Sequence, residues 1–147
     1  MYTNKGFTFV EVLLVIAILG VLVGLAIPFY QSFQVSSQLD NTTQEVAQTL
    51  RRAQARSMAS EYFSPFGLHF ESQKFVLFRG DTYIESDPFN EPVEVPGILS
   101  VSSVFGPDIV FSRVEGRPDV IGSVTISTTY GKSRTININE LGVINVL

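Results

Sequence analysis

A long apolar run near the N-terminus constrains this chain more than any other feature. From Val12 to Ile27 the sequence has no charged residue and no strongly polar one, and Pro28 closes the run. Counted from Phe7, 21 residues in an α-helix span roughly 31 Å, which matches the hydrocarbon thickness of a bilayer. The length therefore predicts a membrane-spanning helix over residues 7–28.

Glu11 is the exception inside this apolar segment. A carboxylate within a membrane helix costs on the order of 2.5–3.5 kcal/mol on insertion scales, so it usually has a partner and a role. A signal peptide fits poorly, because its apolar region is about 7–15 residues long and a small-residue cleavage site follows it. A simple single-pass anchor explains the length of the run but not the carboxylate.

Charge and glycine placement add detail to the predicted anchor. Lys5 precedes the run, which biases the N-terminus to the cytoplasm and places the rest of the chain outside the membrane. Gly20 and Gly24 form a GxxxG pattern, which can let two membrane helices approach closely. The same glycines with Pro28 also give the stretch a low helix propensity, so that the helix could bend or melt locally. Both interpretations stay open.

Beyond Pro28 the apolar residues become sparse and periodic. They recur at intervals typical of an amphipathic helix: Phe29, Phe33, Leu39, Val46, Leu50 and Ala53. We therefore expect one helix over residues 7–60, whose second half packs one stripe against a domain. Arg51, Arg52 and Arg56 near its end form either a basic patch for a partner or a complement to the helix dipole. Glu61 is a candidate ion-pair partner for one of them.

The remaining sequence has the pattern of β-structure. Residues 66–70 and 74–79 form a predicted hairpin, and residues 82–84 a short third strand before a Pro-rich acidic loop. Further strands are expected at residues 98–104, 109–114, 123–129, 134–139 and 143–147. One long helix followed by many strands indicates an α+β fold, with an antiparallel sheet on the C-terminal half of the helix.

The part of the chain beyond Pro28 is acidic and has no cysteine. Lys5 and Glu11 are the only charged residues before it, so 9 of the 10 Lys and Arg and 13 of the 14 Asp and Glu lie beyond it. This balance disfavours binding to nucleic acid or anionic lipid. Without a disulfide, the domain must be stabilised by its core alone.

Residues with catalytic or metal-binding chemistry are scarce. His69 is the only histidine and lies in a strand pattern, where we expect a structural role. Carboxylates gather in one region, residues 81–94: Asp81, Glu85, Asp87, Glu91 and Glu94. Calcium takes such oxygen ligands, but their spacing matches no EF-hand loop. We expect a solvated acidic loop with calcium as the alternative, and neither enzymatic activity nor a cofactor.

The residues Gly6-Phe7-Thr8-x-x-Glu11, with Pro28 closing the apolar run, resemble the N-terminus of type IV pilins and pseudopilins. The resemblance implies that a prepilin peptidase cuts between Gly6 and Phe7 and methylates the new N-terminus. It implies that Glu11 faces the N-terminus of a neighbouring subunit and gives each incoming subunit its axial register. It also implies that the segment before Pro28 can lose helical structure on assembly.

The same resemblance divides the chain and names its partners. Residues 1–6 would be the leader, 7–28 the transmembrane and filament-core helix, and 29–147 the amphipathic half of the helix plus a β-rich head. The implied partners are other pilin or pseudopilin subunits, the prepilin peptidase, an inner-membrane assembly platform and membrane lipid. The implied location is the cytoplasmic membrane, with a single pass and the head in the periplasm or outside, and then the filament.

Residues 50–59 and 131–143 also resemble H-type pseudopilins and related minor pilins, while the lack of cysteine departs from disulfide-clamped major pilins. The expected function is that of a minor structural subunit of a type IV pilus or a type II secretion pseudopilus. A simple single-pass anchored protein with a β-rich domain is one alternative. A DNA-binding minor pilin is the other, and it needs six arginines to converge in a cationic stripe: Arg51, Arg52, Arg56, Arg113, Arg117 and Arg134.

Overall fold

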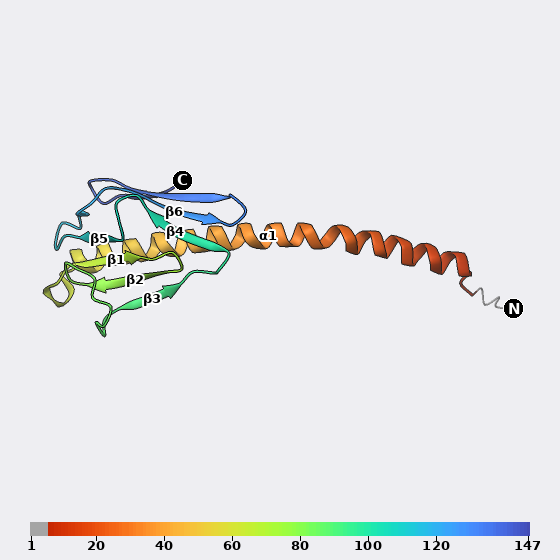
Figure 1. The fold of residues 1–147 in the computed structure, drawn as a ribbon, viewed down its shortest axis with the longest axis horizontal. Helices are drawn as coiled ribbons and strands as arrows, with labels where there is room; N and C mark the ends of the chain where they lie inside the picture. Colours follow the sequence, from red (N-terminus) through yellow and green to blue (C-terminus); the bar gives the residue numbers. More distant parts are fainter. Residues whose placement is uncertain (1–5) are drawn as a thin grey trace. The chain divides into compact units, whose positions relative to one another are not determined.

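The computed structural model describes residues 6–147, except for the side chains of residues 26–29, 31 and 32. The chain divides into two compact units between Ser36 and Ser37. Helix α1, Phe9–Met58, contributes to both units (Figure 1). The helix predicted over residues 7–60 is confirmed to within two residues at each end.

In the N-terminal unit, every described side chain between Gly6 and Leu25 is exposed. The segment is helical because no side chain between Val12 and Leu25 offers a polar group that competes with the backbone hydrogen bonds. Over the residues described, no helix combines the length and the apolar character needed to cross a membrane. The division of the chain into residues 1–6, 7–28 and 29–147 stays a prediction.

The second unit, called the head below, is built on the C-terminal half of α1. The apolar stripe of this half is buried: Leu39, Val46, Ala47, Leu50 and Ala53. Their spacing places them on one face of the helix. Thr43 and Thr49 are buried as well, and their hydroxyl groups donate to the carbonyl oxygens one turn earlier, at 2.7 and 2.8 Å. A short 3-10 turn, η1, Glu61–Phe63, follows α1.

Eight strands in the described part of the chain form two antiparallel four-stranded sheets. The first sheet has the order β3-β2-β1-β5, from β1 Phe66–Phe70, β2 Lys74–Arg79, β3 Glu91–Glu94 and β5 Asp108–Phe111. The second has the order β4-β6-β7-β8, from β4 Leu99–Ser103, β6 Gly122–Thr128, β7 Ser133–Ile138 and β8 Ile144–Val146. One hydrophobic core joins both sheets to α1, which lies alongside them (Figure 1). The predicted α+β fold is confirmed, although the strands form two sheets rather than one.

The predicted hairpin is confirmed at both strands, but the predicted third strand is wrong. Residues 82–84 form no strand, and the ring of Tyr83 instead stacks on His69 with centroids 4.0 Å apart. The third strand is β3, which begins within the predicted Pro-rich loop and extends beyond it. Pro92 is tolerated there because β3 is an edge strand that pairs only with β2, so the missing N–H of proline can face away from the ladder.

Four of the later strand predictions are confirmed to within one residue at each end, namely those that correspond to β4, β6, β7 and β8. The strand predicted over residues 109–114 is wrong at its C-terminal end, because β5 ends at Phe111. The chain reverses there, and Phe111 forms an isolated bridge with Pro118. Val114 takes a φ of 70°, a left-handed conformation that is rare for a β-branched residue and ends the extended run.

Candidate functional site

Thr8 and Glu11 cap the first turn of α1. The backbone N–H of Glu11 donates to Thr8 Oγ1 at 3.3 Å, and the backbone N–H of Thr8 donates to Glu11 Oε2 at 3.5 Å. Since Phe9 is the first helical residue, the two side chains form a capping box. The carboxylate also lies where the helix dipole favours negative charge. The T-x-x-E pattern carried this signal, yet the sequence-based prediction gave Glu11 only a role between subunits.

Glu11 lies among apolar side chains on an exposed helix face. It lines a shallow groove of about 250 Å³ with Phe7, Val12, Val15 and Ile16. The Phe7 side chain is 83% exposed, and a Cβ added at Gly6 would meet nothing within 4 Å. The peptide bond between residues 6 and 7 and the Glu11 carboxylate are therefore both open to a partner in the isolated subunit.

The residues predicted to give the helix flexibility lie inside α1. A Cβ added at Gly20 or Gly24 would meet nothing within 4 Å, so both glycines border open space. Such space at two glycines four residues apart permits close approach of a second helix. Helix α1 includes position 28, and the side chain of Pro28 lies outside the described residues. The flexibility of this segment stays a prediction.

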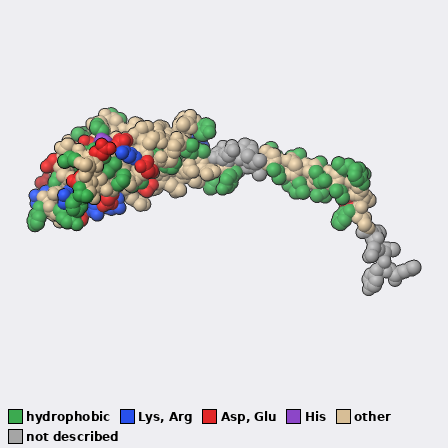
Figure 2. Space-filling model, turned by 60° about the horizontal axis from the view of Figure 1, so that its bottom comes forward, with side chains coloured by type: hydrophobic (Ala, Val, Ile, Leu, Met, Phe, Trp, Pro, Cys, Tyr) green, Lys and Arg blue, Asp and Glu red, His purple; other side chains and the backbone are tan. Residues whose placement is uncertain are grey.

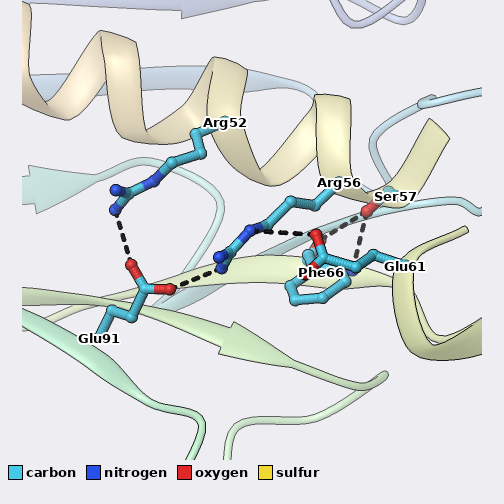
Figure 3. A network of polar contacts seen from close by, with 6 residues as sticks. All are labelled: Arg52, Arg56, Ser57, Glu61, Phe66 and Glu91. Atoms are coloured by element: carbon cyan, nitrogen blue, oxygen red, sulfur yellow. Dashed lines mark hydrogen bonds and ion pairs between the residues drawn. The ribbon is translucent and has the colours of Figure 1, made fainter. Parts of the chain in front are cut away.

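Two arginines at the end of α1 hold an edge strand of the head. Arg52 Nη2 and Arg56 Nη1 each bind one oxygen of Glu91, at 3.1 and 2.6 Å (Figure 3). Arg56 Nε also pairs with Glu61 at 3.3 Å, which confirms the predicted pairing of Glu61 with one of these arginines. The Ser57 hydroxyl accepts the first backbone N–H of β1 at 2.8 Å. Together these contacts fix β1, β3 and η1 to the helix.

The other arginines of the hypothetical DNA-binding stripe are also engaged within the head. Their oxygen partners are the backbone of Ile144 for Arg51 at 3.0 Å, Glu115 for Arg117 at 3.3 Å and Asp40 for Arg134 at 2.8 Å. Arg113 instead lies over the ring of Phe63, with Cζ 6.0 Å from the centroid. Five of the six arginines thus bind an oxygen of the head, and four of these five bind a carboxylate.

His69 on β1 connects two strands, in agreement with its predicted structural role. Its Nδ1 lies 2.5 Å from Asp108 Oδ1 on β5, and its ring is covered by Tyr83. Its Nε2 lies 3.6 Å from Glu71 Oε1, which in turn pairs with Lys74 at 3.1 Å. The hydrogen bond to Glu71, together with the charge of that carboxylate, raises the pKa of Lys74.

Two carboxylates of the acidic region 81–94 have partners inside the chain. Asp87 Oδ1 accepts the backbone N–H of Phe89 at 2.8 Å, and Glu91 is bound by the two arginines described above. Among the residues that the structure places, no group of three or more His, Asp or Glu side chains is arranged to hold a metal ion.

Comparison with known proteins finds fimbrial proteins that are similar in sequence. Residues 1–27 match the family described as the prokaryotic N-terminal methylation motif. A fimbrial protein of Pseudomonas aeruginosa is 36% identical over 125 residues, which cover 77% of this chain and 81% of that protein. Fimbrial protein EcpB of Eikenella corrodens is 41% identical over 49 residues, or 33% of this chain, and the match spans 31% of EcpB.

Two solved structures have a similar fold. The minor pseudopilin EpsH from the Type 2 Secretion System of Vibrio cholerae gives a TM-score of 0.60 at 13% identity, covering 75% of this chain and 96% of that one. The type IV minor pilin FimU of Pseudomonas aeruginosa gives 0.58 at 12% identity, covering 74% and 92%. At these identities the likeness shows the fold alone. Because the fimbrial relative matches most of both chains and the methylation motif covers the capped apolar helix, the chain belongs to the type IV pilin and pseudopilin superfamily.

Proposed function

We propose that this chain is a minor, non-enzymatic structural subunit of a type IV pilus or a type II secretion pseudopilus. The observation that carries the proposal is the exposed apolar surface of α1. The large hydrophobic side chains from Phe7 to Leu25 are between 46% and 83% exposed, and Figure 2 shows hydrophobic side chains along this segment. A continuous apolar surface of this kind is driven out of water. Membrane lipid covers it before assembly, and the helices of other subunits cover it afterwards.

The N-terminal segment has two further roles in this proposal. Residues 7–28 anchor the subunit in the cytoplasmic membrane, with the N-terminus in the cytoplasm and the head in the periplasm or outside. The prepilin peptidase cuts between Gly6 and Phe7, both of which are exposed, and methylates the new amine. An inner-membrane assembly platform then exchanges lipid contacts for helix contacts in the filament.

Glu11 gives the incoming subunit its register. In the isolated subunit its carboxylate is held by the backbone N–H of Thr8 at 3.5 Å, a long and therefore weak hydrogen bond. In the filament the same carboxylate faces the α-amino group on Phe7 of a neighbouring subunit. The attraction is strong in a low-dielectric helix core, where an unpaired charge is costly. Only an axial position that brings the two charges together avoids that cost.

The assignment as a minor subunit rests on the fold of the head. Of the two solved structures described above, one is a minor pseudopilin and the other a type IV minor pilin. The DNA-binding alternative is disfavoured, because four of the six arginines that it needs pair with carboxylates of the head. A simple single-pass anchor leaves the placement of Glu11 unexplained.

The proposal is tested by locating the full-length chain in its own cells. Filaments are sheared from the surface and compared with the membrane fraction by quantitative mass spectrometry. We expect the chain in the filament fraction, at a small fraction of the copy number of the major subunit. A chain confined to the membrane while filaments assemble normally contradicts the proposal, and equal copy numbers contradict the minor assignment.

A further inference from the structure

We propose that the end of the head around η1 is a docking surface for a partner protein that presents carboxylates next to apolar side chains. This surface is called the η1 surface below, and the proposed function leaves it unassigned. Its apolar members are between 44% and 83% exposed: Met58, Ile84, Tyr62, Phe63, Phe89 and Val114. Figure 2 shows hydrophobic and cationic side chains next to one another at this end of the head.

The η1 surface is one connected patch rather than scattered residues. The rings of Tyr62 and Phe89 lie 5.5 Å apart, which joins η1 to the loop before β3. The backbone N–H of Val114 donates to the carbonyl oxygen of Ser57 at 3.2 Å, which joins the loop after β5 to the helix end. Exposed Tyr, Phe and Met side chains in one patch are enriched at protein–protein interfaces, and contiguous apolar patches mark such sites.

Backbone strain is concentrated in the same patch. In the described part of the chain, the non-glycine residues with positive φ are Ser60, Tyr62, Phe63 and Val114, at 50°, 52°, 55° and 70°. Each such conformation costs roughly 1–3 kcal/mol and usually persists where function needs it. Here the strain is not offset by burial, since Tyr62, Phe63 and Val114 all present their side chains to solvent. The strained backbone therefore serves to display these side chains.

Two arginines give the patch its charge preference. Arg79 Cζ lies 3.8 Å from the ring centroid of Phe89 and 5.6 Å from that of Tyr62, and Arg113 lies over Phe63. Among the described arginines, these are the two whose guanidinium groups contact an aromatic ring but bind no oxygen. A guanidinium whose plane is fixed by a ring keeps its N–H edge free, and that edge fits a carboxylate in a bidentate arrangement. Two carboxylates beside the patch are already engaged, because Glu61 pairs with Arg56 and Asp87 accepts the backbone N–H of Phe89. The two guanidinium groups are the charged groups that the patch offers to a partner, so the partner is acidic as well as apolar.

The cleft next to the η1 surface is more acidic than the surface itself. An open cleft of about 740 Å³ begins at Phe63 and Arg113 and is also lined by three carboxylates. Two of these are engaged: Asp119 accepts the backbone N–H of Val110 at 2.8 Å, and Glu115 pairs with an arginine. Asp81 adds a third negative charge. A carboxylate of the partner is thus directed away from the cleft, to the aromatic side on which Arg79 lies.

The proposal is tested with the full-length chain in nanodiscs of neutral phosphatidylcholine. The probes are three fluorescein-labelled peptides of nine residues. One alternates glutamate with leucine, the second lysine with leucine, and the third glutamate with serine. Fluorescence anisotropy measures binding. We expect the glutamate–leucine peptide to bind most tightly of the three and the lysine–leucine peptide to bind least tightly. Binding of the glutamate–leucine peptide should weaken in high salt. No binding of the glutamate–leucine peptide, or equal binding of all three, overturns the proposal.

Variants assign the binding to the patch. The double variant Arg79→Gln with Arg113→Gln should weaken binding of the glutamate–leucine peptide about tenfold, since the charge-assisted contact with Arg79 and the nearby positive charge of Arg113 are both lost. The matched control, Lys132→Gln with Arg134→Gln, removes the same charge elsewhere and should leave binding unchanged. The charge-reversed double variant, Arg79→Glu with Arg113→Glu, should instead bind the lysine–leucine peptide. A misfolded head would not acquire this new binding. Equal effects of the first and control variants, or tighter binding of oligothymidine than of the acidic peptide, contradict the proposal.

Discussion

Replacing Glu11 with glutamine separates the two roles assigned to this carboxylate. Glutamine at the third helical position completes a capping box as glutamate does, so Glu11→Gln preserves the start of the helix. It carries no charge, so it cannot pair with the α-amino group of a neighbouring subunit. Thr8→Ala has the opposite effect, because it removes the cap and keeps the carboxylate.

The structure sets the expected sizes of the two effects. Both hydrogen bonds of the cap are long, at 3.3 and 3.5 Å, so Thr8→Ala should cost about 0.5–1 kcal/mol, near the lower end for N-cap residues. Glu11→Gln leaves the α-amino group of the neighbouring subunit without its carboxylate, and breaking an ion pair in a low-dielectric core in this way costs about 3–5 kcal/mol. At about 1.4 kcal/mol per factor of ten, Glu11→Gln should lower incorporation by two orders of magnitude or more. Thr8→Ala should lower it by less than one.

The assay measures the filament-to-membrane ratio of full-length variants by quantitative mass spectrometry, with Thr8→Ser as the conservative control. We expect wild type and Thr8→Ser to be alike, Thr8→Ala to be mildly reduced and Glu11→Gln to be confined to the membrane. The reasoning is refuted if Glu11→Gln assembles as wild type does. It is also refuted if Thr8→Ala is impaired as severely as Glu11→Gln, because the cap would then be the decisive contact.

Three further predictions concern the head. Gly67→Ala would bring a Cβ within 2.5 Å of a backbone oxygen of β5, so it should lower the free energy of unfolding of the head by about 3 kcal/mol or more. The control Gly97→Ala adds a Cβ that meets nothing within 4 Å, so its free energy of unfolding in urea should be close to that of wild type. Glu91→Gln breaks ion pairs whose side chains are 31–49% exposed, so it should cost about 1 kcal/mol, and the cost should shrink in high salt. Because Glu71 raises the pKa of Lys74, the stability from this pair should be present at neutral pH and lost as the pH rises through the raised pKa; a Lys74 side-chain NMR titration at or below the ordinary lysine value would contradict this.

Local patterns in the sequence predicted most of the fold. The stripe from Leu39 to Ala53 has helical period and is buried, and the hairpin of β1 and β2 shows as two aromatic and β-branched runs around a short polar turn. Prediction failed where tertiary contacts decide. Pro92 is acceptable only because β3 is an edge strand, and nothing local reveals an edge.

The candidate site was predicted in part for the same reason. The T-x-x-E cap is readable from local spacing, but the prediction for Glu11 concerned its cost in the membrane and its role between subunits rather than its place at the start of the helix. The partner of Arg52 and Arg56 was not readable, since Glu91 lies 35 residues or more away in the sequence and reaches them only through the fold of β3. The display of Tyr62 and Phe63 depends on positive φ angles, which side-chain pattern does not encode.

Entry into a filament through a processed N-terminus leaves a chemical record in the chain itself. Intact-mass and terminal-peptide mass spectrometry of the chain from purified filaments reads that record. We predict a first residue of Phe7, an added methyl group on its amine and loss of residues 1–6, with Gly6→Ala blocking the cut. Filament-borne chains that retain Met1, or a Gly6→Ala chain processed as wild type, would show that the chain does not depend on this cut to enter the filament.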